Sequence, residues 1–219
     1  MKKLDTVLFD LDGTLIDTNP IIIKSYQHAF KTHFPQLDIS EKTIIEDIGP
    51  PLETIFRKYT DDAELIDTTI QTYLSYYRKH EHDLFKLYPG VRSTLELLKK
   101  NGIKIAIVTS KFLESANPSV EHFNLNPYFD VFISLDQVKH PKPDPEPVLL
   151  ALKKLNSTDK AIMIGDNPSD IQAGKNAGIL TAGVAWSIKG KRVLLDEHPD
   201  YLLENMHDIL DIIKKESGA

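Results

Sequence analysis

The stretch Thr6–Thr18, TVLFDLDGTLIDT, decides the fold of this chain. A short apolar run of the kind that forms a buried strand is followed at once by two carboxylates, Asp10 and Asp12, and then by Gly13. Side chains alternate between the two faces of a strand, so residues two positions apart leave the strand on the same side. Two like charges held that close repel each other unless something positive lies between them. The stretch is therefore either a polar turn after a strand or a site for a metal ion and a phosphate group.

The composition is that of an ordinary globular protein with a proper core. The 219 residues are 41% hydrophobic and 26% charged. The net charge of −6 argues against nucleic acid as a partner, because a phosphate backbone selects basic surfaces. An anionic small molecule remains a fitting partner, since a local site can be positive inside an acidic protein. Cysteine is absent from the sequence, which excludes disulfides, thiolate metal sites and cysteine nucleophiles.

Hydropathy gives no sign of a membrane partner. No stretch approaches the roughly 18 consecutive apolar residues that a membrane-spanning helix needs. The opening MKKLDTVLF carries two lysines, but its apolar run is too short for a signal peptide and runs into Asp10. We therefore expect a cytoplasmic protein, and no feature of the sequence specifies an oligomeric state.

Most of the chain alternates between two kinds of segment. Short runs rich in Val and Ile, with little polar alternation, are typical of strands buried on both faces, and helix-like stretches separate them. This alternation predicts an α/β fold with a doubly wound parallel sheet. The expected strands are Thr6–Phe9, Ile103–Val108, Val131–Leu135, Ala161–Ile164 and Thr181–Trp186, and the expected helices are Val91–Lys100, Pro145–Leu155, Ser169–Asn176 and Asn205–Lys215.

One segment interrupts this alternation. Between residues 19 and 86 the sequence shows helical periodicity and no convincing buried strand. We therefore expect an inserted all-helical cap at 19–86, with residues 1–18 and 87–219 forming an α/β catalytic core. A turn at Gly49-Pro50-Pro51-Leu52 punctuates the cap, and it is our candidate for a loop that contacts the leaving group. Gly49 and Pro50 are accordingly predicted to bind substrate.

Polar side chains follow the expected strands where ligands bind in such sheets, beyond the carboxyl ends. Each polar group has an ordinary explanation when taken alone. Asp10 and Asp12 fit a turn, Thr109 fits a helix cap, Lys142 fits a surface loop, and acids before a helix favour its dipole. Their joint occurrence favours a site. The segments are Asp10–Thr14, Thr109-Ser110-Lys111, the loop with Lys142, and Gly165–Asp170.

Phosphate chemistry has a use for each of these groups. A carboxylate such as Asp10 can attack phosphorus and form an aspartyl-phosphate, and a second acid, Asp12, can protonate the leaving oxygen and then activate water. Mg²⁺ prefers oxygen ligands, and Asp10 and Asp166 offer two. The Lys142 ammonium and the Thr109 hydroxyl can hold phosphoryl oxygens. A dication and a lysine in one pocket would explain how the paired aspartates tolerate each other.

These motifs, in this order, resemble the four motifs of the haloacid dehalogenase superfamily over nearly the whole chain, with a helical cap after the first motif. The resemblance implies that Asp10 is the nucleophile and Asp12 the acid and base. It also implies Mg²⁺ ligation by Asp10, by the backbone carbonyl of Asp12 and by Asp166, with Asp170 supporting the metal waters or orienting Lys142. Gly13, Thr14, Ser110 and Lys111 are the further expected substrate-binding residues, and Lys111 would meet the extra charge of a pyrophosphate. The motifs read Asp10-Leu-Asp-Gly-Thr14, Thr109-Ser110, Lys142 and Gly165-Asp-Asn-Pro-Ser-Asp170.

A finer likeness is to the bacterial inorganic pyrophosphatases of this superfamily, which are close to the phosphoglycolate phosphatases. The main departure is Asn167-Pro168, where many relatives carry Ser or another small polar residue. The resemblance implies a Mg²⁺-dependent phosphohydrolase whose first expected substrate is inorganic pyrophosphate. Three alternatives remain: a phosphatase for phosphoglycolate or another small ester, a phosphomutase of β-phosphoglucomutase type, and a non-catalytic module that binds a phosphorylated ligand. The stretches are Phe9–Thr18, Ile48–Leu52, Ile107–Lys111, His140–Pro147, Gly165–Asn167 and Ala182–Trp186.

Overall fold

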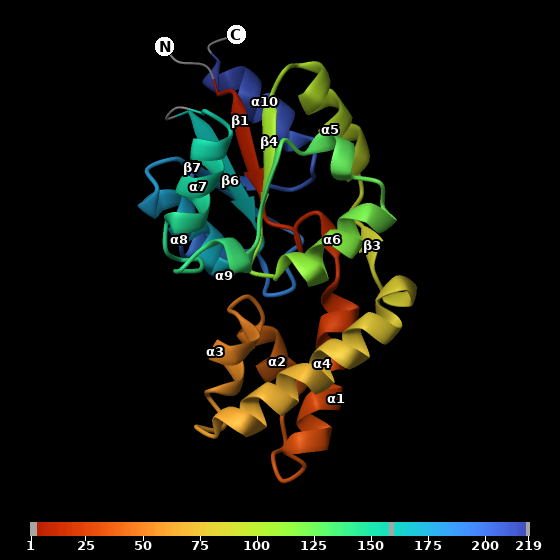
Figure 1. The fold of residues 1–219 in the computed structure, drawn as a ribbon. Coiled ribbons are helices and arrows are strands. Elements are labelled where there is room, and N and C mark those ends of the chain that lie inside the picture. The colour runs from red at the N-terminus through yellow and green to blue at the C-terminus, as the bar shows by residue number, and fades with distance from the viewer. Residues whose placement is uncertain (1–3, 158–159, 218–219) are drawn as a thin grey trace. The chain divides into compact units, whose positions relative to one another are not determined.

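The chain is described by a computed structural model that covers residues 4–157 and 160–217, without the side chains of residues 81 and 82 (Figure 1). Two compact units divide the chain. One unit combines Met1–Ile16 with Leu87–Ala219, and the other is Asp17–Lys86. Strands β2 (Ile16–Asp17) and β3 (Lys86–Leu87) pair where the chain passes from one unit to the other and back.

The larger unit is built on a six-stranded sheet in the order β5-β4-β1-β6-β7-β8. All the pairings in this sheet are parallel, which confirms the predicted α/β class. The first strand is central, with β4 on one side and β6 on the other, so the strand order reverses there. The strands are β1 (Thr6–Phe9), β4 (Lys104–Val108), β5 (Val131–Ile133), β6 (Ala161–Gly165), β7 (Leu180–Val184) and β8 (Tyr201–Leu203).

Helices connect the parallel strands. Parallel crossovers are right-handed in nearly all proteins, so strands added in opposite directions along the sheet carry their helices on opposite faces. The chain moves from β1 to β4 and β5 in one direction, and from β6 to β7 in the other, which makes the sheet doubly wound. The connecting elements are α5 (Val91–Lys100), α6 (Leu113–His122), α7 (Glu146–Lys154), α8 (Pro168–Asn176) and α9 (Lys191–Leu195), with 3₁₀ turns at Asn126–Tyr128 and Leu135–Gln137. Helix α10 (Asp208–Glu216) follows the last strand.

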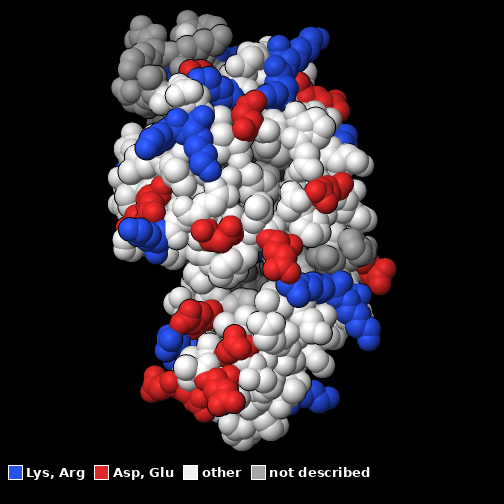
Figure 2. Space-filling model, viewed as in Figure 1, with Lys and Arg blue, Asp and Glu red and all other residues white. Residues whose placement is uncertain are grey.

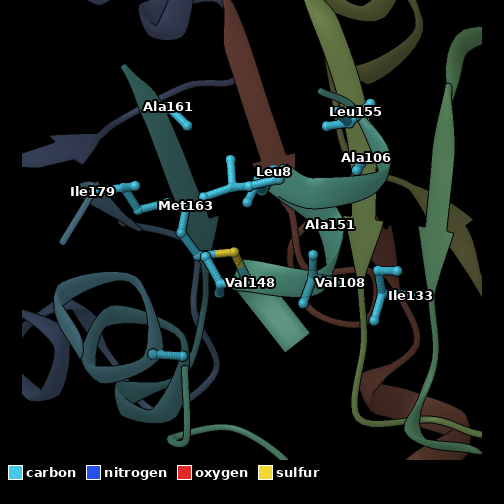
Figure 3. Close-up of a cluster of buried hydrophobic side chains, with 12 residues drawn as sticks. Leu8, Ala106, Val108, Ile133, Val148, Ala151, Leu155, Ala161, Met163 and Ile179 are labelled. Carbon is cyan, nitrogen blue, oxygen red and sulfur yellow. The ribbon is translucent and has the colours of Figure 1, made fainter. Parts of the chain in front are cut away.

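The core of this unit lies on both faces of the sheet. On one face, Leu8 of β1 meets residues of β4, β5 and β6 and the apolar sides of α7 and α8 (Figure 3). The alternate residues Val7 and Phe9 point to the other face and are equally buried. Burial on both faces explains why the sequence of β1 has no polar alternation. The cluster on the first face comprises Leu8, Ala106, Val108, Ile133, Val148, Ala151, Leu152, Leu155, Ala161, Met163, Ala173 and Ile179.

The smaller unit consists of helices and has its own core. Aromatic rings from α1, α3 and α4 pack together, with the rings of Tyr26 and Tyr73 4.8 Å apart and those of Tyr26 and Phe56 5.7 Å apart. The Ser40 hydroxyl accepts the amide of Thr43 and so caps α2. The helices are α1 (Asn19–His33), α2 (Glu41–Asp47), α3 (Leu52–Phe56) and α4 (Ala63–Leu84).

The surface carries charges of both signs. On the face drawn in Figure 2, the basic and acidic side chains of the described residues are interspersed among uncharged ones rather than gathered into one basic band. Among the described residues of this face there is no basic stripe of the kind that a nucleic acid selects. Among the described helices, none combines the length and the apolar composition required to span a membrane.

Candidate active site

The chain turns sharply where it leaves β1. The Asp10 amide still donates to the carbonyl of Ile164 on β6, at 2.9 Å, and the Gly13 amide donates to the carbonyl of Ile16, at 2.8 Å. Gly13 has φ +76°, a conformation that side chains disfavour. A Cβ at Gly13 would lie 2.2 Å from Asp166 Oδ2, so the backbone of this turn approaches the carboxylate directly. Both facts require glycine at position 13.

Three carboxylates meet at this edge of the sheet. Asp10 follows β1, Asp166 follows β6, and Asp170 lies in the first turn of α8. One oxygen of each lies within 4.8 Å of the others, and all three residues are buried. Gly165 makes room for this arrangement, because a Cβ there would lie 2.2 Å from Asp170 Oδ2. Because the carboxyl ends of parallel strands lie at the same edge of the sheet, these residues meet although they are up to 160 positions apart in sequence.

Lys142 is the cation of this cluster. Its Nζ donates to Asp10 Oδ1 at 2.7 Å, to Asp170 Oδ1 at 2.5 Å and to the carbonyl of Val108 at 2.9 Å. An ammonium has three N–H donors, so all three are accounted for. Burial alone would lower the pKa of Lys142, but the charges of Asp10 and Asp170 outweigh it and raise the pKa above its ordinary value. Lys142 therefore stays protonated.

The loop that carries Lys142 is braced from α7. The Glu146 carboxylate accepts the amides of Lys139 and His140, each at 2.9 Å. The hydrogen bond from the Lys139 amide is the main reason why the pKa of Glu146 lies below its usual value. Asp144 in turn accepts the Glu146 amide at 2.9 Å. These contacts turn a proline-rich loop into a fixed support for the lysine.

The three carboxylates carry more negative charge than Lys142 neutralises. Burial raises the pKa of Asp10 to about 7. The charge of Lys142 lowers this pKa, and the charge of Asp170 partly cancels the effect of Lys142. Burial, followed by the charges of Asp10 and Asp170, raises the pKa of Asp166 well above its ordinary value. A compact, buried, all-oxygen group with excess negative charge suits a hard dication such as Mg²⁺. The residues present therefore fit this metal.

Asp170 has a second contact besides Lys142. Its Oδ2 accepts the backbone amide of Asn167 at 3.0 Å, and the Asn167 side chain accepts the amide of Ser169 at 3.4 Å. The Asn167 side chain also accepts the amide of Asp170, and this reciprocal pair is a capping box, which satisfies free amides at the start of α8. The Asn167-Pro168 pair thus forms an ordinary helix start. Asp170 is fixed by the same hydrogen bonds.

Asp12 stands apart from the carboxylate cluster. Its Oδ1 accepts a hydrogen bond from Lys111 Nζ at 2.9 Å, in an ion pair that is partly exposed. Lys111 reaches this position from the carboxyl end of β4, where its amide donates to Thr109 Oγ1 at 3.2 Å. The sequence predicted both residues for the site, but it did not predict that they pair with each other.

The remaining predicted residues are distributed unevenly. Thr109 is buried beside the cluster, and Ser110 is partly exposed. The Thr14 side chain is buried, and its hydroxyl has no hydrogen-bond partner among the described residues. Gly49 and Pro50 lie in the loop between α2 and α3, in the other unit.

Sequence reasoning missed two partners of the cluster. The buried Ser187 hydroxyl donates to the backbone carbonyl of Asp166 at 2.7 Å, and the Val108 carbonyl accepts from Lys142. Ser187 follows the last residues expected in the β7 strand, in a tail whose pattern is irregular. Val108 acts through its backbone, which no side-chain motif reveals. A hydroxyl just beyond a strand end was the available signal for Ser187.

A comparison with protein families matches residues 7–184 to the haloacid dehalogenase-like hydrolases. This match spans most of the chain and includes every motif residue named above. The chain belongs to the haloacid dehalogenase-like hydrolases. It is therefore an enzyme of a hydrolase family, which confirms the resemblance found in the motifs.

Similar proteins in this hydrolase family carry more specific names. The chain is 45% identical to pyrophosphatase PpaX of Bacillus velezensis, over 96% of this chain and 97% of that protein. It is 44% identical to pyrophosphatase PpaX of Bacillus pumilus, over 97% of each chain. Among solved structures, a predicted phosphoglycolate phosphatase from Haemophilus somnus has a TM-score of 0.86 and 25% identity, covering 97% of this chain and 99% of that one.

Proposed function

We propose that this hydrolase is a Mg²⁺-dependent phosphohydrolase that works through an aspartyl-phosphate and whose main substrate is inorganic pyrophosphate. The observation that carries the chemistry is the group of three buried carboxylates with one fully engaged lysine at the ends of β1 and β6. The family is consistent with it, and relatives at 41–45% identity over nearly the full chain bear the name pyrophosphatase.

The metal would be held by carboxylates of the cluster. In the proposal, Asp10, Asp166 and the backbone carbonyl of Asp12 supply ligands, and Asp170 supports metal-bound water or orients Lys142. When bound, Mg²⁺ would neutralise the excess negative charge of the cluster and of the phosphoryl group. Ser187 would act through Asp166, because its hydrogen bond fixes the backbone from which that carboxylate extends.

The chain's own residues would carry the phosphoryl transfer. An oxygen of Asp10 forms a bond to phosphorus while the bond from phosphorus to the leaving oxygen breaks and its electron pair stays on that oxygen. Asp12 gives that oxygen a proton and later takes one from the water that hydrolyses the aspartyl-phosphate. The Thr109 hydroxyl and Ser110 hold the phosphoryl oxygens, and Lys142 joins them by giving up one of its present acceptors. The turn at Gly13 and Thr14 lines the same pocket.

We assign the unit Asp17–Lys86 the part of a cap and the other unit that of a catalytic core. A helical unit inserted between β1 and the rest of the sheet is suited to cover a small substrate and exclude bulk water. The loop of Gly49 and Pro50, between α2 and α3, is the proposed contact with the leaving group. Lys111 is the proposed contact with the extra charge of pyrophosphate.

Phosphoglycolate is the second candidate substrate. It is favoured by the fold likeness to a protein described as a predicted phosphoglycolate phosphatase. Both candidates are small molecules whose leaving groups carry negative charge, and both need the same core residues. They differ in what the leaving-group side of the pocket must recognise.

Phosphate release in the presence of Mg²⁺ tests the proposal. The panel contains pyrophosphate, phosphoglycolate, sugar phosphates and nucleotides, with Asp10→Asn as the inactive variant and the exposed Asp211→Asn on α10 as its matched control. We expect pyrophosphate to react fastest, Asp211→Asn to keep full activity, and Asp10→Asn to lose at least about a thousandfold. Faster release from phosphoglycolate would replace the substrate and keep the chemistry.

Two other results would overturn the hydrolase proposal at different points. Phosphate that moves between positions of a sugar phosphate, with dependence on a bisphosphate activator, would indicate a phosphomutase. Tight binding of a phosphorylated ligand by folded, Mg²⁺-loaded protein without turnover would indicate a binding module.

A further inference from the structure

The two lysines at the site are used in different ways. Lys142 is buried and gives all three N–H donors to Asp10, Asp170 and the Val108 carbonyl. Lys111 keeps 18% of its side chain exposed and donates to the carboxylate of Asp12, which is 17% exposed. The pair of Lys111 and Asp12 is therefore more accessible from solvent than the pair of Lys142 and Asp10, whose side chains are 3% and 10% exposed.

The backbones that carry the outer pair are fixed. The amide of Lys111 donates to Thr109 Oγ1, and its carbonyl accepts the amide of Leu135 at 2.8 Å. The turn after Asp12 is closed by the hydrogen bond from Gly13 to Ile16. A change of partner therefore needs no movement of the backbone, because the long and flexible lysine side chain can carry its ammonium to another anion.

The pair engages one oxygen of the carboxylate that the proposed chemistry needs. In the proposed function, Asp12 must reach the leaving oxygen with a proton and then reach a water molecule. While Lys111 is bonded to Asp12 Oδ1, one of the two carboxylate oxygens is committed to the ammonium. An uncharged leaving group offers the ammonium no alternative partner, but an anionic leaving group does.

We propose that Lys111 exchanges partners during substrate binding, from the carboxylate of Asp12 to a negatively charged leaving group. The exchange releases Asp12 for proton transfer only when the leaving group is an anion. Lys111 then selects phosphoryl donors with anionic leaving groups, such as the second phosphate of pyrophosphate, over donors whose leaving groups are neutral. This inference rests on the proposed function and adds the residue that makes leaving-group charge matter.

The test compares two phosphoryl donors that differ in the charge of the leaving group. Pyrophosphate has an anionic leaving phosphate, and ethyl phosphate has a neutral group that leaves as ethanol, so the leaving oxygen of each takes a proton from Asp12. Lys111→Met removes the charge and keeps a side chain of similar length, and Lys111→Arg keeps the charge. Lys99→Met is the matched control, because Lys99 also pairs with an aspartate, Asp130. Asp130 immediately precedes β5 and so lies at the amino ends of the strands, away from the site at their carboxyl ends.

We expect Lys111→Met to lower kcat/KM for pyrophosphate by about tenfold to a hundredfold. The same variant should not lower kcat/KM for ethyl phosphate, because removal of the ammonium leaves both oxygens of Asp12 available, and Lys111→Arg should keep most of the preference for pyrophosphate. Lys99→Met should leave the ratio of the two substrates unchanged. Retained turnover of ethyl phosphate shows that the variant is folded.

An equal loss with both substrates would overturn the exchange, because a lysine that only positions Asp12 must affect both alike. If the wild-type protein prefers phosphoglycolate, the same comparison is made with phosphoglycolate in place of pyrophosphate, and the exchange predicts the same selective loss. Absence of turnover with every donor in the wild-type protein would instead remove the proposed function itself.

Discussion

The ammonium of Lys142 and the Oδ1 of Asp170 are joined by a hydrogen bond of 2.5 Å in the interior of the larger unit. The same carboxylate accepts the amide of Asn167 through its other oxygen. Asp170 thus connects the position of the buried lysine to the start of α8. Because Asp170 both pairs with the buried ammonium and caps the helix, it should contribute to the stability of the fold as well as to the site.

Asp170→Ala should therefore be strongly destabilising. It leaves the amide of Asn167 without its acceptor and Lys142 without one of its two carboxylates, and breaking a buried pair costs about 3–5 kcal/mol. Urea denaturation measures this cost. Asp208→Ala is the matched control, because Asp208 accepts the amides of Glu204 and Asn205 in an exposed position, and its loss should cost about 1 kcal/mol. Equal costs in the two variants would show that Asp170 is not part of a buried pair.

The turn at Gly13 should not tolerate a side chain. Gly13→Ala adds strain at φ +76° and places Cβ in the position of Asp166 Oδ2. Gly102→Ala adds strain alone, because φ is +72° and a Cβ there meets no atom within 4 Å. Both variants should lose about 1 kcal/mol or more from strain. If Mg²⁺ binds as proposed, it should raise the melting temperature, and only Gly13→Ala should also lose this rise. A full rise in that variant would contradict the close approach.

The stability of the metal-free protein should depend on pH through Asp10. Its pKa is about 7 in the folded protein and 3.8 ordinarily, so the folded state binds the proton more tightly than the unfolded state. The resulting stabilisation is present below about pH 4 and is lost as the pH rises to about 7. Urea midpoints in a chelator between pH 4 and 8 measure this loss. Asp10→Asn should remove this part of the slope, and an unchanged slope in that variant would assign the pH dependence to other groups.

Leu8 should be among the costly core positions. It is fully buried in β1 and faces residues from β4, β6 and α7 in the cluster of Figure 3. Leu8→Ala should lower the free energy of unfolding by about 2–5 kcal/mol. Leu149→Ala on α7 is the control, because that side chain is 48% exposed and its truncation should change stability by less than about 1 kcal/mol. Thermal unfolding followed by circular dichroism distinguishes the two results.

The sequence predicted the fold class, and its helix prediction at Val91–Lys100 coincides with α5. Both predictions rest on strong local signals. The strands are continuous apolar runs, and the helix ends at Asn101-Gly102. The ends of strands were less accurate. The third expected strand stops at Ile133, because Leu135 begins a 3₁₀ turn, and the fifth ends at Val184 instead of Trp186.

Several elements escaped prediction for identifiable reasons. Helix α6 contains Asn117-Pro118, a pair that usually marks a turn, and Pro118 lies inside the helix. Strand β8 has three residues, Tyr201–Leu203, which is too short for a period to show. Helix α2 has seven residues and one buried apolar side chain, Ile44. Such elements are set by tertiary packing more than by local pattern.

For the site, the rule that ligands bind beyond strand ends was sufficient to bring Asp10, Lys142 and Asp166 together. It could not predict which side chains pair. The bond between Lys111 and Asp12 joins residues 99 positions apart and depends on the relative positions of β1 and β4. The role of the Val108 carbonyl likewise comes from backbone geometry, which the sequence does not encode locally.

The central place of β1 has a consequence for synthesis on the ribosome. This strand is made first, but its neighbours β4 and β6 follow about 98 and 155 residues later, as the pairs of Thr6 with Lys104 and with Ala161 show. At translation rates of roughly 5–20 residues per second, an apolar segment waits about 8–30 seconds for its second partner. Until then β1 cannot be covered by its neighbouring strands, and the cluster of three carboxylates is assembled only after β6 and the first turn of α8 have emerged.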